Sequence, residues 1–365
     1  MIGMRQNRRR MLALGVALLA GAVLVAGLAA PAGAATPSGA VSSAAAAAAP
    51  STGEFAPLDQ PAPALTTPTA DLKASLTCSA GLANATTEPV LLISATGVDS
   101  AQNFSWSWEP FLTAHHIPWC ASDQPGAAAA NMTDMVKRVD YLVYGIRYMH
   151  QVSGRKIALI GASQGGMIER WPLRFFPDTR AMVDDVISLD GDNHGTLDGD
   201  LICVASLCAP SFFQQAIGSN FITALNSGQE TFPGISYTNI YTVTDDIVTP
   251  NLPGIATTTP LSGPGDITNA SVQQLCPLMV TEHLILASSN PVAADLALDA
   301  LTHAGPATPQ VPASTCAMAP DAMPGIPFLN TQTGAASVLA TFALNTATAP
   351  LVTAEPQLPS YVYAK

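Results

Sequence analysis

The chain has 365 residues, which is long enough for one large domain or two smaller ones. Hydrophobic residues make up 48% and charged residues only 11%, which excludes a disordered chain, because disorder needs low hydrophobicity and high charge. The net charge is −12, and four of the 14 basic residues stand in the first ten positions. The rest of the chain then carries 10 basic against 26 acidic residues, or −16. This gives no electrostatic basis for nucleic-acid binding and favours neutral or apolar partners.

The first 34 residues have the pattern of an export signal. Arg8-Arg9-Arg10 is a positive stretch, residues 11–30 are apolar, and Ala32-Gly33-Ala34 is a small-x-small cleavage pattern, so we expect cleavage after Ala34. The alternative is an uncleaved anchor, because 20 apolar residues could span a bilayer. The sequence does not distinguish export by the general secretory route from export by the twin-arginine route. No other run approaches membrane-spanning length, so we expect a secreted protein without stable membrane insertion.

Composition divides the rest of the chain into a linker and one domain. Residues 35–60 are rich in Ala, Ser, Pro and Thr and indicate a linker without a core pattern. We expect a single catalytic domain over residues 61–365, because no second core-sized segment follows.

Within that domain, apolar runs alternate with amphipathic segments. In chain order, the patterns predict a strand at 90–95, a short apolar run at 116–121, a helix at 129–152, a strand at 156–161, a helical stretch at 165–176 with Pro172 as a kink or end, strands at 183–189 and 235–243, a shorter strand at 278–281, and a helix from Pro291 to about 302. Strands that alternate with helices indicate an α/β domain with a mostly parallel sheet.

The sharpest chemical signal is the G-x-S-x-G motif of Gly161-Ala162-Ser163-Gln164-Gly165. It stands between a predicted strand and a predicted helix, the context that a nucleophile elbow needs. Bulky side chains two positions before or after Ser163 would collide with the strand and the helix. The turn exposes the serine hydroxyl near a helix N-terminus, where backbone N–H groups favour a developing anion. The alternative is an ordinary serine in a glycine-rich loop.

A serine nucleophile needs a base, and in this class of hydrolase the order along the chain is serine, acid, histidine. His283 follows the predicted strand at 278–281, whereas His303 stands at the end of a predicted surface helix, so His283 is the expected base. Asp245 and Asp246 follow an apolar strand, and either carboxylate could orient the imidazole.

The run from Asp190 to Gly195 has the first half of a calcium-loop pattern, but its twelfth position is Leu201 where a bidentate Glu is expected. We reject the calcium loop and interpret Asp192 as a polar group of the substrate pocket.

Together these residues resemble a known family, the α/β-hydrolase lipases of the Candida antarctica lipase B type. The resemblance covers roughly residues 75–320. Its carrying segments are Thr96-Gly97 with Gln102-Asn103-Phe104, Ser163 to Gly166, Phe175-Phe176-Pro177, Asp192 with Gly195-Thr196, Phe213-Gln214-Gln215, Thr238 to Tyr241 with Thr244-Asp245, and Glu282-His283. It implies an α/β-hydrolase fold with a mostly parallel central sheet and helices on both faces.

The resemblance also implies roles for individual residues. Ser163 is the implied nucleophile, Asp245 rather than Asp246 the acid, and His283 the base. The implied oxyanion hole consists of the Gln164 backbone N–H together with the backbone N–H and hydroxyl of Thr96. The implied pocket residues are Asp192 and Gln215 on the acyl side and Ile247 and Val248 as an apolar wall. No metal or cofactor is implied.

Two features depart from the family pattern. Ala162 replaces the tryptophan that the lipase B type carries before the nucleophile, so we expect its side chain to face the cavity floor and leave the alcohol side wide. The cysteines differ as well. An even count of six favours disulfides in an oxidising compartment, and no spacing suggests a metal site.

By the resemblance, Cys78 pairs with Cys120 and Cys276 with Cys316, and the third bridge of the family has no counterpart. Cys203 and Cys208 are extra, and we predict that they pair with each other. Residues five apart in a regular helix are too far apart for a disulfide, so this pair requires a loop or a broken helix.

These observations predict a secreted, monomeric serine hydrolase that cleaves carboxylic esters, acylglycerols or other apolar esters, through an acyl-enzyme. Its substrate could be presented at a lipid–water or polymer surface. A polyester depolymerase is the alternative within the class, and a non-catalytic binding protein on a hydrolase scaffold is the alternative outside it.

Overall fold

The computed structural model describes residues 54–203, 207–254 and 256–364, all of which fall in one unit, residues 47–365. The expected export signal at 1–34 and residues 35–53 of the expected linker lie outside the described residues. Phe55 pairs with Tyr363, and Ala56 is buried and donates its N–H to the Val362 carbonyl. The packed part of the chain therefore includes residues before 61.

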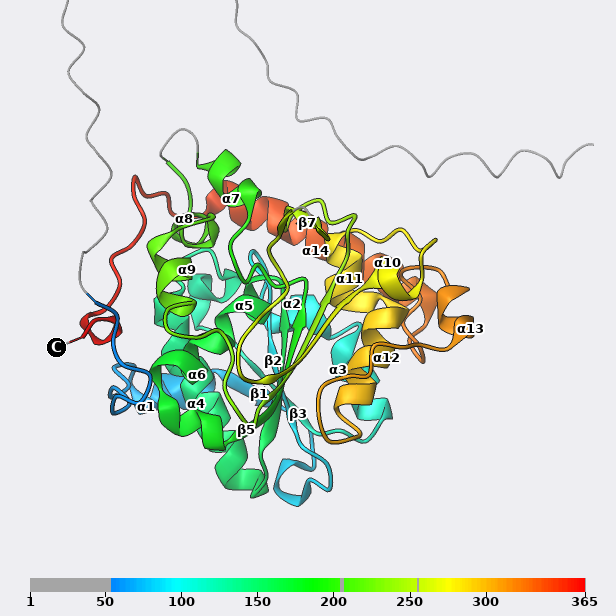
Figure 1. Ribbon diagram of the computed structural model, residues 1–365, viewed down its shortest axis with the longest axis horizontal. Coiled ribbons are helices and arrows are strands. Elements are labelled where there is room, and N and C mark those ends of the chain that lie inside the picture. Colours follow the sequence, from blue (N-terminus) through cyan, green and yellow to red (C-terminus); the bar gives the residue numbers. More distant parts are fainter. Residues whose placement is uncertain (1–53, 204–206, 255, 365) are drawn as a thin grey trace, which may run out of the picture. The chain divides into compact units, whose positions relative to one another are not determined.

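A seven-stranded sheet forms the centre of this unit (Figure 1). The strand order is β1-β3-β2-β4-β5-β6-β9, and every neighbouring pair is parallel except β1 with β3 at the edge. The bounds are β1 (Leu76–Cys78), β2 (Val90–Ile93), β3 (Trp119–Ser122), β4 (Ile157–Ala162), β5 (Val183–Leu189), β6 (Ser236–Tyr241) and β9 (Asp266–Ser271), with a separate pair β7 (Asn251–Leu252) and β8 (Ala256–Thr257). The predicted mostly parallel α/β sheet is confirmed.

The predicted strands at 90–95, 156–161, 183–189 and 235–243 correspond to β2, β4, β5 and β6. The strand predicted at 278–281 is wrong, because this segment is a loop in which the Leu278 side chain is 96% exposed. On the side away from β5, β6 pairs with the edge strand β9, which the sequence did not reveal. Its residues Asp266 to Ser271 are mostly polar or small and are only partly buried at the sheet edge, so they show no continuous apolar run.

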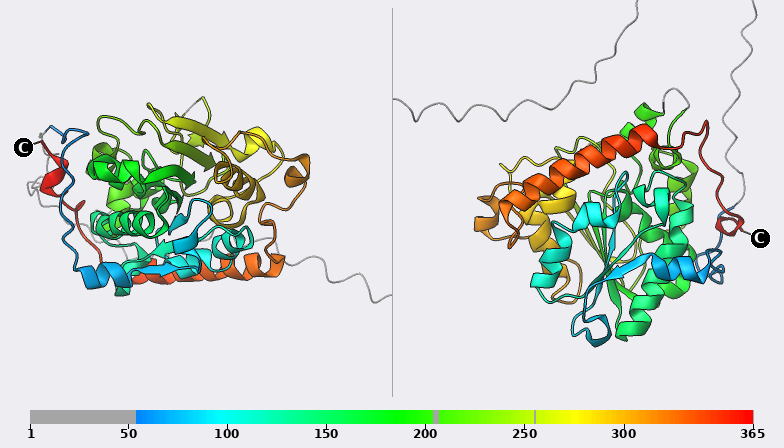
Figure 2. Two further views of the ribbon diagram at one scale, coloured as in Figure 1. Left: turned by 90° about the horizontal axis from the view of Figure 1, so that it is seen from below. Right: turned by 180° about the vertical axis from the view of Figure 1, so that it is seen from behind.

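Helices cover both faces of the sheet (Figure 2). One face packs against α2, α3, α11 and α12, and the other packs against α4, α5, α6 and α9. The helices are α1 (Thr69–Ala74), α2 (Ser100–Phe104), α3 (Trp108–Ala114), α4 (Val136–Ser153), α5 (Gln164–Ile168), α6 (Arg170–Phe175), α7 (Leu197–Ile202), α8 (Pro210–Gln215), α9 (Asn220–Leu225), α10 (Val272–Leu275), α11 (His283–Ser289), α12 (Pro291–Ala300), α13 (Ala313–Cys316) and α14 (Phe328–Thr348); short 3₁₀ turns occur at Leu82–Asn84, Gly126–Ala130, Pro177–Ala181 and Ser360–Val362.

Three helix predictions can be compared with these bounds. The helix expected at 129–152 begins later, at Val136, because a 3₁₀ turn occupies the preceding Gly126–Ala130. The stretch expected at 165–176 is interrupted at Glu169 between α5 and α6. Pro172 causes no break, because it lies in the first turn of α6, where a missing N–H removes no hydrogen bond. The helix expected from Pro291 is α12.

The long helix α14 was not predicted. It packs against α2 and α11 and has little burial of its own, with only Thr331, Gly334 and Val338 buried. In the described ranges, no helix combines the length and hydrophobicity needed to cross a membrane.

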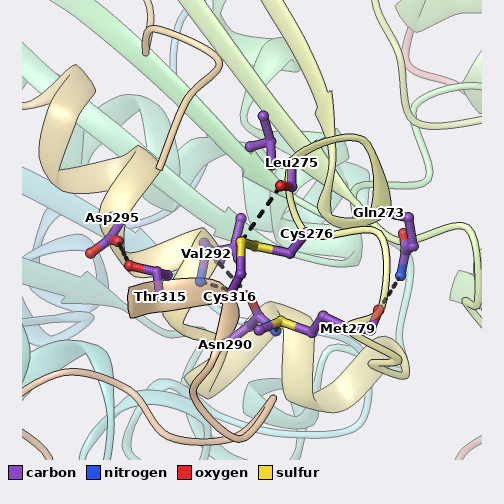
Figure 3. Close-up of a disulfide and its surroundings, with 10 residues drawn as sticks. Gln273, Leu275, Cys276, Met279, Asn290, Val292, Asp295, Thr315 and Cys316 are labelled. Atoms are coloured by element: carbon purple, nitrogen blue, oxygen red, sulfur yellow. Dashed lines mark hydrogen bonds between the residues drawn. A yellow bond between two sulfur atoms is a disulfide. The ribbon is translucent and has the colours of Figure 1, made fainter. Parts of the chain in front are cut away.

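All six cysteines are paired as predicted, Cys78 with Cys120, Cys203 with Cys208, and Cys276 with Cys316. The bridge from Cys276 joins the end of α10 to α13 (Figure 3). Cys203 follows the last residue of α7, so the helix ends where the short bridge requires it to end. The Cα atoms of Cys203 and Cys208 are then 5.4 Å apart, within the usual disulfide range.

Candidate active site

Ser163 occupies a sharp turn between β4 and α5. Its φ is +54°, a value that a residue with a side chain rarely adopts, and its N–H donates to the Leu189 carbonyl at 2.8 Å. The hydroxyl-bearing side chain lines a cavity at the carboxyl ends of the strands. The strand–turn–helix context of the motif is therefore present.

The motif glycines are required by close backbone approach. A Cβ on Gly161 would overlap the backbone of Gly165, and a Cβ on Gly165 would overlap the Ile93 carbonyl of β2. The tight elbow thus brings the start of α5 directly against β2 and the loop that follows it.

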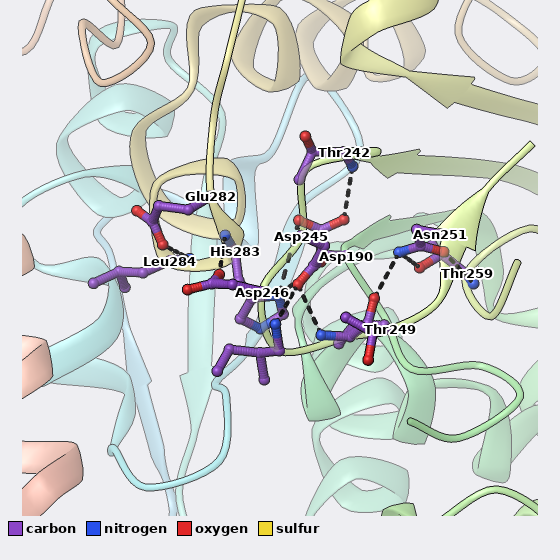
Figure 4. Close-up of polar contacts among 12 residues, drawn as sticks. Asp190, Thr242, Asp245, Asp246, Thr249, Asn251, Thr259, Glu282, His283 and Leu284 are labelled. Carbon is purple, nitrogen blue, oxygen red and sulfur yellow. Dashed lines mark hydrogen bonds and ion pairs between the residues drawn. The ribbon is translucent and has the colours of Figure 1, made fainter. Parts of the chain in front are cut away.

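His283 is the first residue of α11, not the residue after a strand as expected (Figure 4). The Glu282 carboxylate caps this helix by accepting from the N–H groups of Leu284 and Ile285 at 2.8 and 2.9 Å. The His283 N–H donates to Asp246 Oδ1 at 3.2 Å. Helix start and cap therefore hold the imidazole in one place.

Asp245 binds the imidazole from behind. Its Oδ2 lies 3.0 Å from His283 Nδ1, and its Oδ1 accepts from the N–H groups of Ile247 and Val248 at 2.8 and 2.7 Å. Asp246 accepts from the His283 backbone N–H, so of the two candidate acids Asp245 is the one that is hydrogen-bonded to the ring.

Asp245 and His283 each stabilise the charged form of the other. Burial favours a higher pKa for Asp245, but the imidazole charge and the hydrogen bonds to the carboxylate outweigh it, so the pKa of Asp245 lies below its ordinary value. Burial likewise opposes charging His283, yet the adjacent Asp245 carboxylate raises the pKa of the imidazole. A base held this way can take up a proton while its partner stays ionised.

A second carboxyl group, Asp190, lies next to this pair (Figure 4). It is fully buried, its Oδ1 accepts from the Thr242 N–H at 3.0 Å, and its Oδ2 is 3.9 Å from His283 Nδ1. Burial, and then the charge of Asp245, raise the pKa of Asp190 well above its ordinary value. In the sequence, Asp190 stands out only as the first residue of the rejected calcium-loop pattern, and its position directly after β5 is the one further signal.

Ser163 and His283 line the same cavity, which has a volume of about 240 Å³. Thr96, predicted for the oxyanion hole, and the predicted pocket residues Asp192, Gln215, Ile247 and Val248 also line it. The further apolar lining comes from Val98, Phe212, Leu284, Ala287, Val338, Leu339 and Phe342. A cavity whose lining is mostly apolar, with some polar groups, is typical of a site for an apolar ligand.

Asp192 is fully buried at this cavity, and neither carboxylate oxygen has a hydrogen-bond partner in the described residues. Burial raises its pKa to about 7, against the influence of the nearby His283 and Arg170 charges. Asp192 can therefore present a protonated carboxyl group to a ligand near neutral pH.

Ala162 differs from the expectation. Its side chain is fully buried in the core with Ala158 and Ile160, and it is not among the residues that line the cavity. The reason is the strand pleat, because residues two apart on β4 point to the same face and Ala162 continues the apolar row.

The two segments expected to form an oxyanion hole lie side by side. Gln164 Nε2 donates to Thr96 Oγ1 at 3.0 Å, and Thr96 Oγ1 donates to Gln215 Oε1 at 3.0 Å. The Gln164 N–H is the first of α5, a position without an acceptor in its own helix. These groups can meet an anion that forms beside Ser163.

Acidic groups near one another occur at two places in the described part of the chain, Asp190 with Asp245 and His283, and Glu88 with Asp184 and Asp185. In the first, the carboxylate and imidazole are already engaged with each other. In the second, the Lys156 amine lies 2.9 Å from Asp184. Neither arrangement by itself indicates a metal.

Two lipases are among the known proteins that this chain resembles. Lipase B of Pseudozyma antarctica is 30% identical over 223 residues, which is 60% of this chain and 64% of that protein, so the match spans less than two thirds of that relative. The crystal structure of Aspergillus fumigatus lipase B matches with a TM-score of 0.73 and 26% identity, over 86% of this chain and 76% of that one. No protein-family model matches the chain. The resemblance to the lipase B type and the α/β-hydrolase fold are confirmed.

Proposed function

We propose that this protein is a secreted carboxylic-ester hydrolase of the lipase or esterase kind, with Ser163, His283 and Asp245 as its triad. The observation that carries the proposal is the juxtaposition of the Ser163 elbow and the Asp245-bound His283 on one largely apolar cavity. The two lipase B relatives support the same chemistry.

In the proposed reaction, His283 Nε2 removes the hydroxyl proton of Ser163 as the serine oxygen attacks the ester carbonyl. The carbonyl π electrons move onto the oxygen, which the N–H groups of Gln164 and Thr96 and the Thr96 hydroxyl stabilise. The tetrahedral intermediate collapses, the C–O bond to the alcohol breaks, and His283 gives the proton to the leaving alcohol. Asp245 keeps the ring oriented and stabilises its protonated form throughout.

Water then repeats the sequence on the acyl-enzyme. His283 takes a proton from water, the hydroxide oxygen attacks the acyl carbon, and collapse returns the proton to Ser163 and releases the carboxylic acid. Each proton in these steps moves between the substrate, water and the triad.

The cavity lining favours substrates with an apolar acyl group. The side chains of Phe212, Leu339 and Phe342 offer apolar contact, whereas Asp192 and Gln215 offer polar contact. Export is part of the proposal, because three disulfides fit an oxidising compartment and the first 34 residues have a signal pattern.

The deciding experiment combines turnover with covalent labelling. We expect the purified protein to hydrolyse para-nitrophenyl esters and to incorporate a fluorophosphonate on Ser163, and Ser163→Ala to lose both. A label on another serine would contradict the assignment. N-terminal sequencing of protein from the culture medium should begin at Ala35 if the export proposal is right.

A further inference from the structure

A buried cation lies behind the proposed oxyanion hole. Arg138, in the first turn of α4, is only 1% exposed, and its Nη1 donates to the Ser94 carbonyl at 2.9 Å and to Gln164 Oε1 at 3.0 Å. Its Nη2 donates to Ser94 Oγ at 3.1 Å. Among the described residues Arg138 forms no ion pair within 4.0 Å, although Asp123 is close enough to affect its pKa.

The charge of Arg138 persists at neutral pH, since burial lowers its pKa only to about 10. A buried charge without an ion-pair partner is costly, so its presence beside a reaction site calls for a functional reason. Its contacts with Ser94 and Gln164 supply one, because these two residues are next in the chain to Ala95 and Ser163, which line the cavity of the proposed reaction.

The orientation of the Gln164 amide is fixed by its neighbours. One end of the amide faces the Asn131 carbonyl at 3.1 Å, which can only accept, so that end is the Nε2 donor. The other end faces the Arg138 guanidinium, which can only donate, so that end is Oε1. The same Nε2 donates to Thr96 Oγ1.

At the hydroxyl of Thr96 the hydrogen bonds keep the same donor-to-acceptor direction, away from Arg138. Because Thr96 Oγ1 accepts from Gln164, its own proton is free to point onward, and it donates to Gln215 Oε1. Gln215 Nε2 donates to the Ser211 carbonyl at 3.0 Å, so the other end of this amide, the accepting Oε1, faces Thr96. The hydrogen bonds therefore all run one way, from the cation toward the cavity.

We propose that Arg138 is a positioning residue that polarises the oxyanion hole through Gln164 and Thr96. When the ester carbonyl becomes an oxyanion, the Thr96 proton moves its hydrogen bond from Gln215 to that oxygen, and the chain back to Arg138 strengthens it. This inference rests on the proposed ester hydrolysis. Hydrogen-bond chains in a low-dielectric interior reinforce one another, and a charge at the far end is felt along the chain.

The proposal predicts a specific kinetic signature. Stabilisation that exists only once the oxyanion has formed raises kcat and leaves KM nearly unchanged. A residue that merely held the loop together would instead affect KM and kcat together, and would act independently of the Thr96 hydroxyl.

The test is a double-mutant cycle between Arg138→Met and Thr96→Val, with Arg174→Met as the matched control. Arg174 is another buried arginine, but it binds Ser227 and Ala56 away from the cavity. Each variant is assayed for kcat and KM on one para-nitrophenyl ester and for inhibition by a boronic acid, whose tetrahedral adduct mimics the intermediate.

We expect Arg138→Met and Thr96→Val each to lower kcat by about 10²-fold and to weaken boronic-acid binding similarly, the typical effect of losing one oxyanion donor. KM should stay within about threefold, and the double variant should be no more than about threefold slower than Thr96→Val, since both changes break one chain. Arg174→Met should resemble the wild type in kcat and in boronic-acid binding.

Losses that multiply in the double variant, or a rise in KM that matches the fall in kcat, would overturn the inference. If Arg138→Met does not fold, Gln164→Met breaks the next link while keeping the main-chain N–H at 164, and the same cycle with Thr96→Val decides. Normal Ser163 labelling together with additive losses overturns only the role of Arg138. Absence of turnover and labelling in the wild type overturns the proposed function and this inference with it.

Discussion

The two ends of β5 carry acidic clusters of similar composition in different settings. At the carboxyl end, Asp190 lies with Asp245 and His283; at the amino end, Asp184 and Asp185 lie with Glu88. In each group the polar atoms lie within 4.8 Å of one another. The carboxyl-end cluster faces a cavity through His283, whereas the neighbour of the amino-end cluster is the exposed Lys156.

The difference between the clusters lies in the donors around each carboxyl group. Asp245 receives an imidazole and two backbone N–H groups, which keep its pKa low despite burial. Burial raises the pKa of Glu88 to about 9 and that of Asp185 to about 7, and the charge of each neighbouring Asp adds to the shift. A buried carboxyl group thus stays ionised only where hydrogen-bond donors or a positive charge contact it. Such contacts distinguish a candidate catalytic site from a cluster of acidic residues that folding has brought together.

The largest expected effect comes from replacing one acid in each cluster by its amide. Asp245→Asn should lower kcat by about 10³–10⁴-fold, because the amide favours the wrong tautomer of His283 and cannot stabilise its charge. Asp185→Asn, the matched change at the other end of β5, should leave kcat unchanged. Steady-state kinetics on one ester checks both, and similar losses in the two variants would contradict the division between the clusters.

Variants of Asp190 test whether this carboxyl group is protonated beside Asp245 and His283. As a neutral acid it can donate to Asp245 and so lower the basicity of the Asp245–His283 pair. Asp190→Leu should therefore raise the pKa of His283 and move the acid limb of kcat/KM upward by about one pH unit, roughly a tenfold loss on that limb. Asp190→Asn, whose amide also donates, should keep the wild-type profile.

An ionised Asp190 predicts a shift of the acid limb in the opposite direction. If Asp190 were ionised, Asp190→Asn would remove a negative charge near His283 and move the acid limb to lower pH. The other carboxyl groups that interact with the charge of His283, Asp192, Asp198, Asp246 and Glu282, are the same in both variants. Melting curves must accompany the profiles, because Asp190→Leu leaves the Thr242 N–H without its acceptor.

The sequence predicted the sheet and the placement of Ser163, because these depend on local signals, apolar runs and glycines at fixed offsets from a serine. It did not predict the edge strand β9 or the helix α14, because their residues are only partly buried and carry weak periodicity. Arg138 and Asp190 were missed for another reason. Their importance comes from contacts with residues at least 26 positions away, such as Gln164 and Asp245, which no local pattern encodes.

Ala162 shows the same limit within the motif itself. The resemblance suggested a cavity residue, but the pleat of β4 places the side chain in the core. Ala162→Trp should therefore overpack the core and destabilise the protein by about 1–3 kcal/mol or more. Melting curves check this. A folded variant of unchanged stability that excludes only esters of bulky alcohols would show that Ala162 shapes the pocket after all.

The smallest expected effect concerns the stability of the amino-end cluster at different pH values. The pKa of Glu88 is about 9 in the folded protein, above its ordinary value, so folding favours the protonated form. This contribution is fully present below the ordinary pKa of a glutamate and is lost as the pH rises toward 9. Asp185, with a pKa of about 7, acts in the same direction. The free energy of unfolding should therefore fall between pH 5 and pH 9.

Glu88→Gln removes the titrating group and keeps its shape, so the variant should match the wild type at pH 5 and exceed it in stability at pH 9. Urea unfolding at the two pH values measures the difference. Asp178→Asn provides a control, since this carboxylate lies on the surface in an ion pair with Arg147 and should not gain stability at pH 9. A Glu88→Gln variant less stable than the wild type at pH 9 would mean that Glu88 is ionised there and bound to a cation, for which Lys156 is the candidate because its charge acts on Glu88. The amino-end cluster would then resemble the carboxyl-end cluster in holding an ionised acid by a dedicated partner.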